Sequence, residues 1–437
     1  MGVTPKRLCV NSLAAVALFL CVSTAAFPLV VSVDGFQFLN SARSLFGPEF
    51  SGRYATFREP GYPIFLRVVH AVFGSSDVWI TLLQASAMGI AVLVTARALG
   101  VRLNNMKGFL FGGLVLAFSL NPIFLGYSSM IFRQALLCLP VALLAWGVNR
   151  AVAAESSKDL SRAALICASG LLFGTAISTM VLYLSLVPGL IMFVRFVLIR
   201  RNGATSAHSA KFLLGTVLTL VLVVLLSWFA WNRVIESSSK PKSDSQTNFT
   251  VRDAISDALE LGPIEFGRQF AFMARATLML GPTDNMNGIV ENELWTRWQL
   301  DPKNLCGAWD GIPDEEAAYA RAFLTSSCRS ATGQKVMRAV RTPGIYLYKI
   351  ASLALLICPI FLLLRRRWRE LLTLATPLWF LVLHASRDYS NDRYGIPLYP
   401  AAIACLAYLI VEVFGFVRDL WIGRRASVDM GMSSFTA

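Results

Sequence analysis

The sequence has few charged residues for a chain of its length. Of 437 residues, 15% are charged and 55% are hydrophobic, whereas a soluble domain carries about a quarter charged residues. This composition excludes an ordinary water-soluble enzyme or binding domain. The chain instead contains repeated apolar runs of about 20 residues, which is long enough to cross a bilayer as a helix. We therefore predict an all-α polytopic membrane protein with about ten transmembrane helices and helical loops outside the cytoplasm.

Ten apolar runs are candidates for membrane spans. Basic residues cluster in alternate loops between them, and the positive-inside rule places those loops and both ends of the chain in the cytoplasm. We keep the first run as a span because it is longer than the apolar region of a cleaved signal peptide, which is the alternative. The predicted spans are 8–33, 78–97, 107–122, 131–149, 162–178, 181–199, 212–231, 344–364, 369–386 and 395–414.

This topology leaves two long segments outside the cytoplasm. The first, 34–77, belongs to an N-terminal transmembrane region that covers 1–231, and the second is the large loop 232–343. C-terminal transmembrane helices follow at 344–414, with a cytoplasmic tail at 415–437. Apolar periodicity in VRDAISDALEL and PDEEAAYARAFLTSSC predicts that the large loop is mostly helical. Because the cytoplasmic side has only turns and a tail, we expect any chemistry on the outer side.

The chain also lacks the residue clusters of a usual metal centre. Its three histidines are far apart and none has the spacing of zinc ligands. Of the eight cysteines, six fall within predicted spans and are expected to be small core residues. Only Cys306 and Cys328 lie in an outer loop, so they are candidates for a disulfide if that side is oxidising.

The net charge of +14 does not indicate a nucleic-acid partner. The large outer loop holds 13 basic and 14 acidic residues, so it is nearly neutral. The excess lies in the cytoplasmic turns, as the topology requires, and partly in the first outer loop. No nucleic-acid partner is therefore expected, and membrane lipid is expected as a partner because the chain is a membrane protein.

Acidic residues are absent from the middle of every predicted span. A proton- or cation-coupled transporter usually needs one there, so coupled transport is disfavoured, whereas uncoupled flipping stays open. Asp34 stands out because it directly follows the apolar run FPLVVSV, at the expected outer end of the first span. Apolar neighbours such as Phe36 and Phe38 would raise its pKa toward that of a useful general base. The alternative is an acid that simply ends a helix.

The rest of the first outer segment contains a predicted helix and a stiff loop. DGFQFLNSARSLFG has an apolar helical face, which would lie either on the bilayer surface or against the protein. FREPGYPIFL, at 57–66, would hold Arg58 and Glu59 rigidly through its two prolines. Arginines bind phosphate in a bidentate manner, so Arg58 and Arg393 are candidates for a lipid-linked phosphate. Their alternative is contact with lipid headgroups or pairing with nearby acids.

Several motifs, in their order along the chain, resemble those of the GT-C membrane glycosyltransferases. The branch that they resemble contains the bacterial protein-mannosyltransferase-like and aminoarabinose-transferase-like enzymes. The resemblance extends over most of the chain and is strong at 34–66 and 392–400. The matching motifs are Asp34, R-x-PGYP at 58–63, NPIFLGYSSM at 121–130, GLLFGTAISTMVLYLSLVPG at 170–189, LSWFAWNRV at 226–234 and DRYGIPLYP at 392–400.

The resemblance implies an inverting enzyme that takes a sugar from a polyprenyl-phosphate donor. The acceptor would be a glycan, lipid or protein of the cell envelope, outside a bacterial inner (plasma) membrane. Asp34 matches the catalytic base, and Arg58 and Arg393 would stabilise the departing lipid phosphate. Glu59 and Tyr394 would contact the substrates.

The chain also departs from that family. FRQALL, at 132–137, places Arg133 and Gln134 where many relatives have an acid, and Ser178 and Thr179 stand where many have an arginine. With one acid candidate we favour no metal and predict no cofactor, although a divalent ion stays open. The alternatives to a glycosyltransferase are an envelope polysaccharide polymerase, ligase or flippase, or a non-catalytic relative.

Overall fold

We describe the chain from a computed structural model. The residues that it describes are 18–44, 60–100, 103, 105–178, 180–201, 251–278, 280, 306–309, 318, 321–386 and 392–433. Within this part the fold is mostly helical, with one very short sheet. The helical elements are residues 18–26, α2 (Val33–Ser44), α4 (Gly61–Phe73), α5 (Asp77–Leu99), α6 (Asn105–Ser119), α7 (Pro122–Gly126), η2 (Tyr127–Ser129), α8 (Gln134–Val152), α9 (Ser157–Ile177), α10 (Met180–Tyr183), α11 (Leu186–Arg201), α13 (Val251–Thr277), α16 (Ala331–Ala339), α17 (Arg341–Leu364), α18 (Trp368–Ala385), η4 (Asp392–Leu398) and α19 (Tyr399–Ser433).

The protein is an integral membrane protein. Among the described residues, six helices are long and apolar enough to cross a membrane. A bent pair, Met106–Ser119 with Pro122–Ser129, makes a seventh if it is one span. The six are Asp77–Leu99, Gln134–Val152, Ser157–Ile177, Met180–Arg201, Arg341–Leu364 and Gly395–Arg418. Their order and positions agree with six of the ten predicted spans.

The remaining predicted spans differ for separate reasons. Span 369–386 corresponds to α18, whose ends carry Arg369, Glu370 and His384, so it is less apolar than the six. Span 107–122 is broken by a bend of 55°, because Asn121 caps a new helix whose first residue is Pro122. Span 212–231 lies outside the described residues.

The prediction for the first span was wrong at its outer end. We expected one helix over 8–33, but the helix ends at residue 26. Pro28 follows, and a proline has no backbone N–H with which to continue a helix. The carbonyl of Phe27 instead accepts a hydrogen bond from Arg329, at 3.0 Å. Asp34 is therefore the second residue of a separate helix, α2, and does not end a membrane span.

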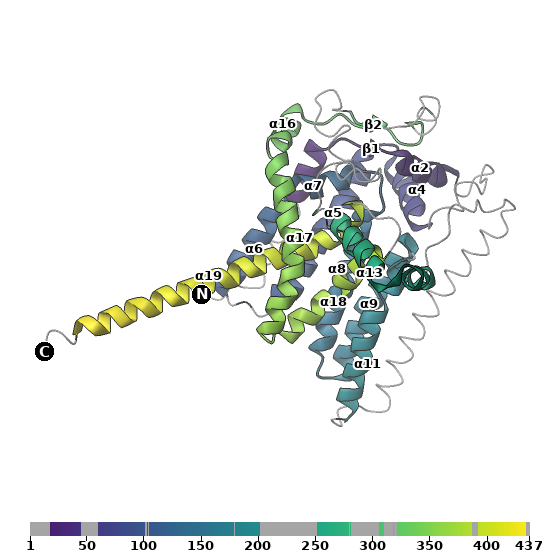
Figure 1. Cartoon of the computed structure of the whole chain (residues 1–437). Coiled ribbons are helices and arrows are strands. Elements are labelled where there is room, and N and C mark those ends of the chain that lie inside the picture. The colour runs from purple at the N-terminus through teal and green to yellow at the C-terminus, as the bar shows by residue number, and fades with distance from the viewer. Residues whose placement is uncertain are drawn as a thin grey trace.

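Small residues let the central helices approach one another closely. A β carbon at Gly147 of α8 would clash with Cys167 of α9. One at Gly174 of α9 would lie 2.9 Å from the side chain of Pro140 in α8. Van der Waals packing around small residues is the usual way in which membrane helices associate. α8 packs on α9 in this manner, also packs on α5, and forms the centre of the bundle (Figure 1).

Several short elements that connect the long helices lie together at one end of the bundle. Strands β1 (Val30–Val31) and β2 (Ala308–Trp309) lie there with α2, α4 and α16 (Figure 1). The predicted helix in DGFQFLNSARSLFG is α2, and it is packed against protein, since Phe36, Leu39 and Ala42 are all buried. The interpretation of α2 as a helix that rests on the bilayer surface alone is therefore wrong.

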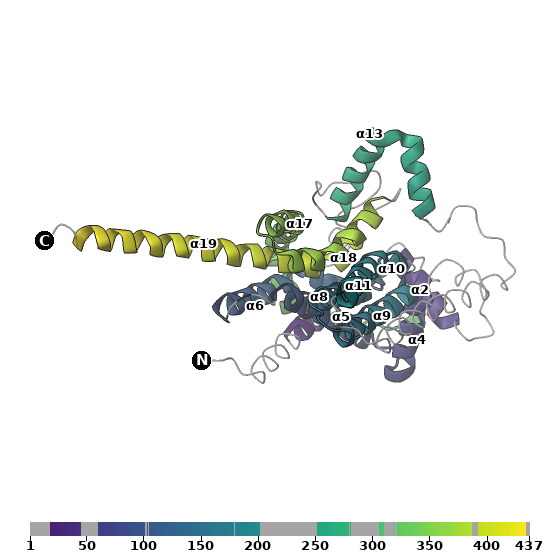
Figure 2. The ribbon, with the colours of Figure 1, turned by 90° about the horizontal axis from the view of Figure 1, so that it is seen from below.

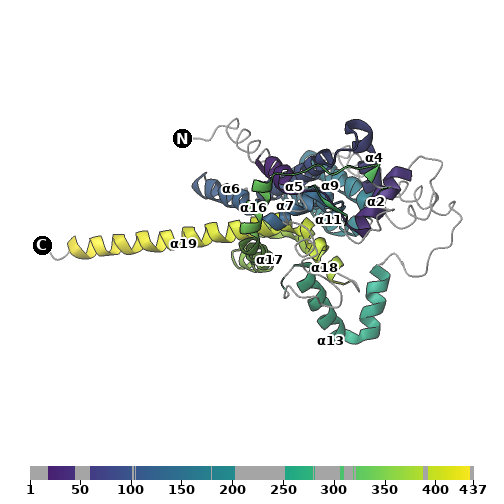
Figure 3. The same ribbon diagram turned by 90° about the horizontal axis from the view of Figure 1, so that it is seen from above.

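The part of the large loop that is described contains one long helix, α13. It includes the predicted segment VRDAISDALEL and bends sharply at Gly262, which has a positive φ of 75° and precedes Pro263. Figure 2 shows α13 as a bent helix that stands to one side of the bundle. Its C-terminal part packs on α18 and η4. At the other end of the molecule, α19 continues past the bundle to Ser433 (Figure 3).

Candidate active site

The start of α2 is fixed by a serine cap. The hydroxyl of Ser32 accepts a hydrogen bond from the backbone N–H of Gly35 at 3.3 Å, and its carbonyl accepts one from Phe36 at 2.7 Å. Asp34 stands in this first turn, where the helix dipole favours a negative charge. The structure describes the helix position of Asp34, and its side chain lies outside the described part. Phe36, two residues later, is buried.

The two residues before this cap are held from both sides. β1 pairs in parallel with β2, with Val30 opposite Ala308 and Val31 opposite Trp309. On its other edge, Val30 forms a bridge with Met130, and its carbonyl accepts a hydrogen bond from Ile131 at 3.0 Å. The sheet therefore connects the large loop, the start of α2 and the segment before α8.

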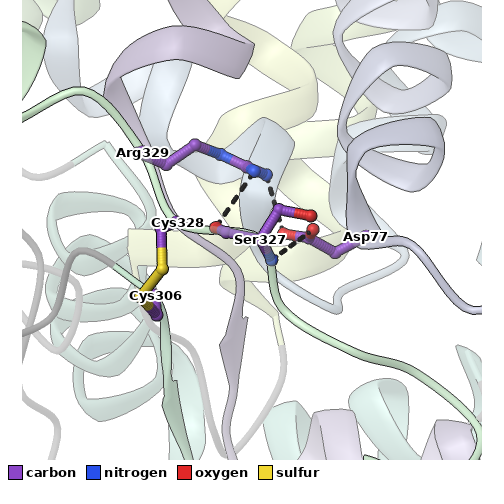
Figure 4. Close-up of a disulfide and its surroundings, with 5 residues drawn as sticks. All are labelled: Asp77, Cys306, Ser327, Cys328 and Arg329. Atoms are coloured by element: carbon purple, nitrogen blue, oxygen red, sulfur yellow. Dashed lines mark hydrogen bonds and ion pairs between the residues drawn. A yellow bond between two sulfur atoms is a disulfide. The ribbon is translucent and has the colours of Figure 1, made fainter.

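A buried ion pair and a disulfide secure the large loop beside β1 (Figure 4). Arg329 donates to the carboxylate of Asp77 at 2.7 Å, and both side chains are at least 97% buried, with 3% and 0% exposed. The same carboxylate accepts the backbone N–H of Ser327 at 2.8 Å. Cys306 and Cys328, the pair that the sequence offered for a disulfide, are joined in the structure. Cys306 lies two residues before the start of β2, and Cys328 lies directly before Arg329.

The GYP motif forms the beginning of α4 and packs into the bundle. Tyr62 is fully buried, and its hydroxyl donates to the side-chain oxygen of Gln84 at 2.7 Å. The amide of Gln84 donates to the carbonyls of Ser128 and Met130, at 2.7 and 2.9 Å. The ring of Tyr62 also meets Phe38 of α2 edge-on, with 4.9 Å between centroids. Tyr62 thus connects α2, α5 and the segment before α8.

The start of α2 approaches the start of α8. A β carbon at Gly35 would lie 3.0 Å from the carbonyl oxygen of Ile131, so a larger residue there would push the two segments apart. α8 begins at Gln134, directly after Arg133. Asp34 and Arg133 therefore belong to adjoining stretches of backbone.

The start of α4 meets the same region through the end of α9. A β carbon at Gly61 would clash with the carbonyl of Ala176. The neighbouring carbonyl, that of Ile177, accepts a hydrogen bond from the guanidinium of Arg133 at 3.3 Å. Three helices, α2, α4 and α8, therefore begin around one cluster of contacts.

The late motif DRYGIPLYP also comes to α8. It forms η4, in which the carbonyl of Ile396 lies 3.5 Å from the sulfur of Cys138, a hydrogen-bond contact one turn into α8. A β carbon at Gly395 would clash with the carbonyl of Thr277, at the end of α13. Arg393 and Tyr394 lie in η4 just before these contacts, and their side chains are outside the described part.

The predicted site residues stand as follows. The backbone positions of Asp34, Arg393 and Tyr394 lie on elements that converge on α8. Arg58 and Glu59 lie outside the described residues, directly before Pro60, from which α4 starts. No group of three or more metal-binding side chains was found among the residues whose side chains are described.

Sequence reasoning missed three of the residues that organise this end of the molecule. Gln84 lies in a predicted span, where a buried amide signals a structural or functional role, but only acidic residues were considered there. Asp77 and Arg329 are separated by about 250 positions, and nothing in their local patterns indicates that they pair.

The comparisons with known proteins give only distant structural similarity. No protein-family model and no curated protein matches this chain. Crystal structures of ArnT from Cupriavidus metallidurans are structural neighbours. The apo structure is 12% identical, covers 93% of this chain and 77% of ArnT, and gives a TM-score of 0.36. The structure bound to undecaprenyl phosphate is 14% identical, covers 93% and 78%, and gives 0.38.

Proposed function

We propose that this protein is a membrane glycosyltransferase that moves a sugar from a polyprenyl-phosphate donor to an acceptor outside the cytoplasm. The observation that carries the proposal is the convergence of the N-terminal ends of α2, α4 and α8. Asp34 belongs to the first helix, Arg58 and Glu59 directly precede the second, and Arg133 precedes the third. Helix N-termini favour anions through their free N–H groups and their dipoles, and arginine is the side chain best suited to phosphate.

The order of the motifs supports the same function. α2 contacts the segment before α8 through Gly35, and η4 contacts Cys138 of α8. The R-x-PGYP segment reaches the segment before α8 indirectly, because Tyr62 is bonded to Gln84 of α5 and Gln84 is bonded to Ser128. A lipid-linked donor also suits the setting, because its phosphate would lie at the membrane surface while its chain stays among apolar helices.

In the proposed reaction, the acceptor attacks the sugar directly. Asp34 takes the proton from the acceptor hydroxyl, and the hydroxyl oxygen forms a bond to the anomeric carbon. The bond from that carbon to the phosphate oxygen breaks, and the electron pair leaves with the polyprenyl phosphate. One displacement of this kind inverts the anomeric centre.

The other predicted residues serve the leaving group and the acceptor. Arg58 and Arg393 stabilise the negative charge that grows on the departing phosphate, and electrostatic stabilisation of this kind is usually a large part of catalysis. Tyr394 donates a hydrogen bond to the same group. Glu59 orients the acceptor or one of the arginines.

The proposal is tested by following the sugar of the donor through its label and the lipid of the donor through the release of undecaprenyl phosphate. Purified protein in proteoliposomes receives undecaprenyl-phosphate sugars labelled in the sugar, with detergent-solubilised envelope glycans and lipids as acceptors. The proposal predicts loss of label from the donor, equimolar release of undecaprenyl phosphate and appearance of label in an acceptor. A flippase would move the intact donor to the other leaflet, and that result without any release would contradict the proposal.

A further inference from the structure

The helix α4 exposes a row of apolar side chains. Its buried face includes Leu66 and Val69, which pack inside the protein. On another side of the helix, Ile64, Val68 and Val72 recur every four residues and are 39%, 54% and 66% exposed. A helix face that meets water normally carries polar or charged residues. These three residues, which we call the α4 stripe, therefore need a partner other than water.

The basic residues of α4 lie beside the stripe and not within it. Arg67 and His70 are both half-buried. Successive residues of a helix are about 100° apart around its axis, so these two fall on one flank, between the buried face and the stripe. A helix that lies in a membrane interface has this arrangement, with a basic flank toward the headgroups and an apolar face toward the acyl chains.

The start of α4 and its end each contact a membrane span near one of its termini. A β carbon at Gly61 would clash with the carbonyl of Ala176, in the last turn of α9. At the other end of α4, the ring of Phe73 stacks on that of Trp79, in the first turn of α5, with 4.6 Å between centroids. Both α9 and α5 are long and apolar enough to span a membrane.

These two span termini belong to the same end of the bundle. The amide of Gln84, in the second turn of α5, donates to the carbonyl of Ser128 in the segment before α8. Arg133, also before α8, donates to the carbonyl of Ile177 at the end of α9. The start of α5 and the end of α9 therefore meet around the start of α8. Because α4 contacts both of these span termini, it lies at the level where the spans leave the membrane.

The α4 stripe is continuous with an exposed apolar side of α5. Trp79, Leu83 and Ile90 fall within about 40° of one another around α5, and they are 40%, 36% and 42% exposed. Since α5 is a span, this side faces lipid. Tryptophan is enriched where spans meet the membrane surface, which agrees with the place of Trp79. Phe73, itself 42% exposed, joins the stripe to this side through its stacking on Trp79.

We propose that α4 lies in the membrane interface and that the α4 stripe contacts the acyl chains of membrane phospholipids. The continuity with the lipid-facing side of α5 identifies lipid, and not a second protein, as the partner. Phe73 and Trp79 lie at the level of the headgroups, and the flank of Arg67 and His70 faces those headgroups. This inference goes beyond the proposed function and does not depend on it.

The test measures the depth of nitroxide spin labels in nanodiscs of phosphatidylethanolamine and phosphatidylglycerol. One label is attached per protein, through Val68→Cys, Val72→Cys or Arg67→Cys. The background carries Cys21→Ser, because Cys21 is exposed, and Cys9→Ser. Oxygen concentrates in the bilayer, whereas a soluble nickel chelate stays in water. The ratio of the two collision rates therefore reports the depth of each label, and thermal unfolding checks that each labelled variant is folded.

Two control positions calibrate this ratio. Leu83→Cys reports the lipid-facing side of α5, and Glu155→Cys reports an exposed residue between α8 and α9. Labels at Val68 and Val72 should give ratios close to that of Leu83 and several-fold above that of Glu155. The label at Arg67 should give a lower ratio than the label at Val68, its neighbour in the sequence.

Two results would overturn the inference. Ratios at Val68 and Val72 as low as that of Glu155 would mean that the stripe faces water. Labels there that are immobilised and shielded from both oxygen and nickel would mean that protein covers the stripe. Neither result bears on sugar transfer, so this inference and the proposed function fail separately.

Discussion

At the scale of single residues, Tyr62 connects the candidate site to the core of the bundle. Its hydroxyl is bonded to Gln84, which in turn holds the carbonyls of Ser128 and Met130. The GYP motif looked like a stiff connector in the sequence. The structure adds that its tyrosine is the buried end of a hydrogen-bond network, which explains why a turn-forming stretch contains an aromatic residue.

Tyr62→Phe is expected to lower the free energy of unfolding by about 1–2 kcal/mol, because the side-chain oxygen of Gln84 is left without its donor. Burial raises the pKa of Tyr62 above its ordinary value of 10.0. The folded state then binds this proton more tightly than the unfolded state, so the contribution of Tyr62 is present below about pH 10 and is lost as pH rises above it. Thermal unfolding in detergent at neutral and alkaline pH measures both effects. An alkaline loss of stability as steep in Tyr62→Phe as in the wild type would contradict this.

The pair of Asp77 and Arg329 gives a second prediction at this scale. Arg329→Gln leaves a buried carboxylate without its counter-charge, which costs about 3–5 kcal/mol. Arg268→Gln is the control, because Arg268 pairs with Glu265 on the surface, and such a pair contributes less than about 1 kcal/mol. Denaturant or thermal unfolding compares the two variants. A similar loss in the free energy of unfolding for both variants would contradict the prediction that the buried pair contributes more than the surface pair.

At the scale of secondary-structure elements, two close approaches position the helix starts. Gly61 brings α4 against the end of α9, and Gly35 brings α2 against the segment before α8. The sequence suggested a rigid loop at 57–66, and α4 does begin within it. The contact partner, Ala176, lies more than a hundred residues away, and a local pattern does not identify it.

Gly61→Ala is expected to lower both stability and sugar transfer. The added methyl group meets a backbone carbonyl, which cannot move as a flexible side chain would, and overpacking of this kind costs about 1–3 kcal/mol. Gly112→Ala is the matched control, since nothing lies within 4 Å of a β carbon at that helical glycine. Alanine there should be neutral or slightly stabilising. Unfolding and transfer are measured on both, and equal behaviour of the two variants would contradict the role of the close approach.

The pairing of β1 with β2 was not predicted, because the two strands come from distant parts of the sequence. Each strand has two residues, too few for a sequence pattern, and β2 lies next to the cross-link between Cys306 and Cys328, which joins it to the segment that carries Arg329. The early end of the first helix has a local cause, Pro28, and could have been predicted from it. The break between α6 and α7 was also readable, from Asn121 followed by Pro122.

The disulfide supplies a prediction for these strands. Both cysteines are exposed, so a reductant can reach them. Their separation is 22 residues, and opening a loop of that size costs about 3 kcal/mol. Reduction should therefore lower the unfolding temperature and slow transfer, because β2 supports β1 and hence the start of α2. The double variant Cys306→Ser, Cys328→Ser should resemble the reduced wild type and be insensitive to reductant. If reductant affected the double variant as much as the wild type, the effect would not come from this disulfide and the prediction would be wrong.

At the scale of the whole molecule, hydropathy predicted the class of protein and six spans closely. Apolar length depends on the local chain, so it can be read from sequence. The candidate site depends on contacts between α2, α4, α8 and η4, which come from distant parts of the chain. The order of the motifs predicted that Asp34, Arg58 and Arg393 belong to one site. Arg133 was identified from the sequence only as a departure from the family pattern. Its place between two helix starts became visible from the fold.

The most direct test of the account is the rate of sugar transfer by Asp34→Asn beside the wild type. Asp159→Asn is the matched control, because Asp159 is also an aspartate in the first turn of a helix, α9. A general base contributes a factor of about 10²–10⁴, so Asp34→Asn should transfer sugar at least about a hundredfold more slowly, while Asp159→Asn stays near the wild-type rate. Transfer by Asp34→Asn at the wild-type rate would contradict the proposed active site.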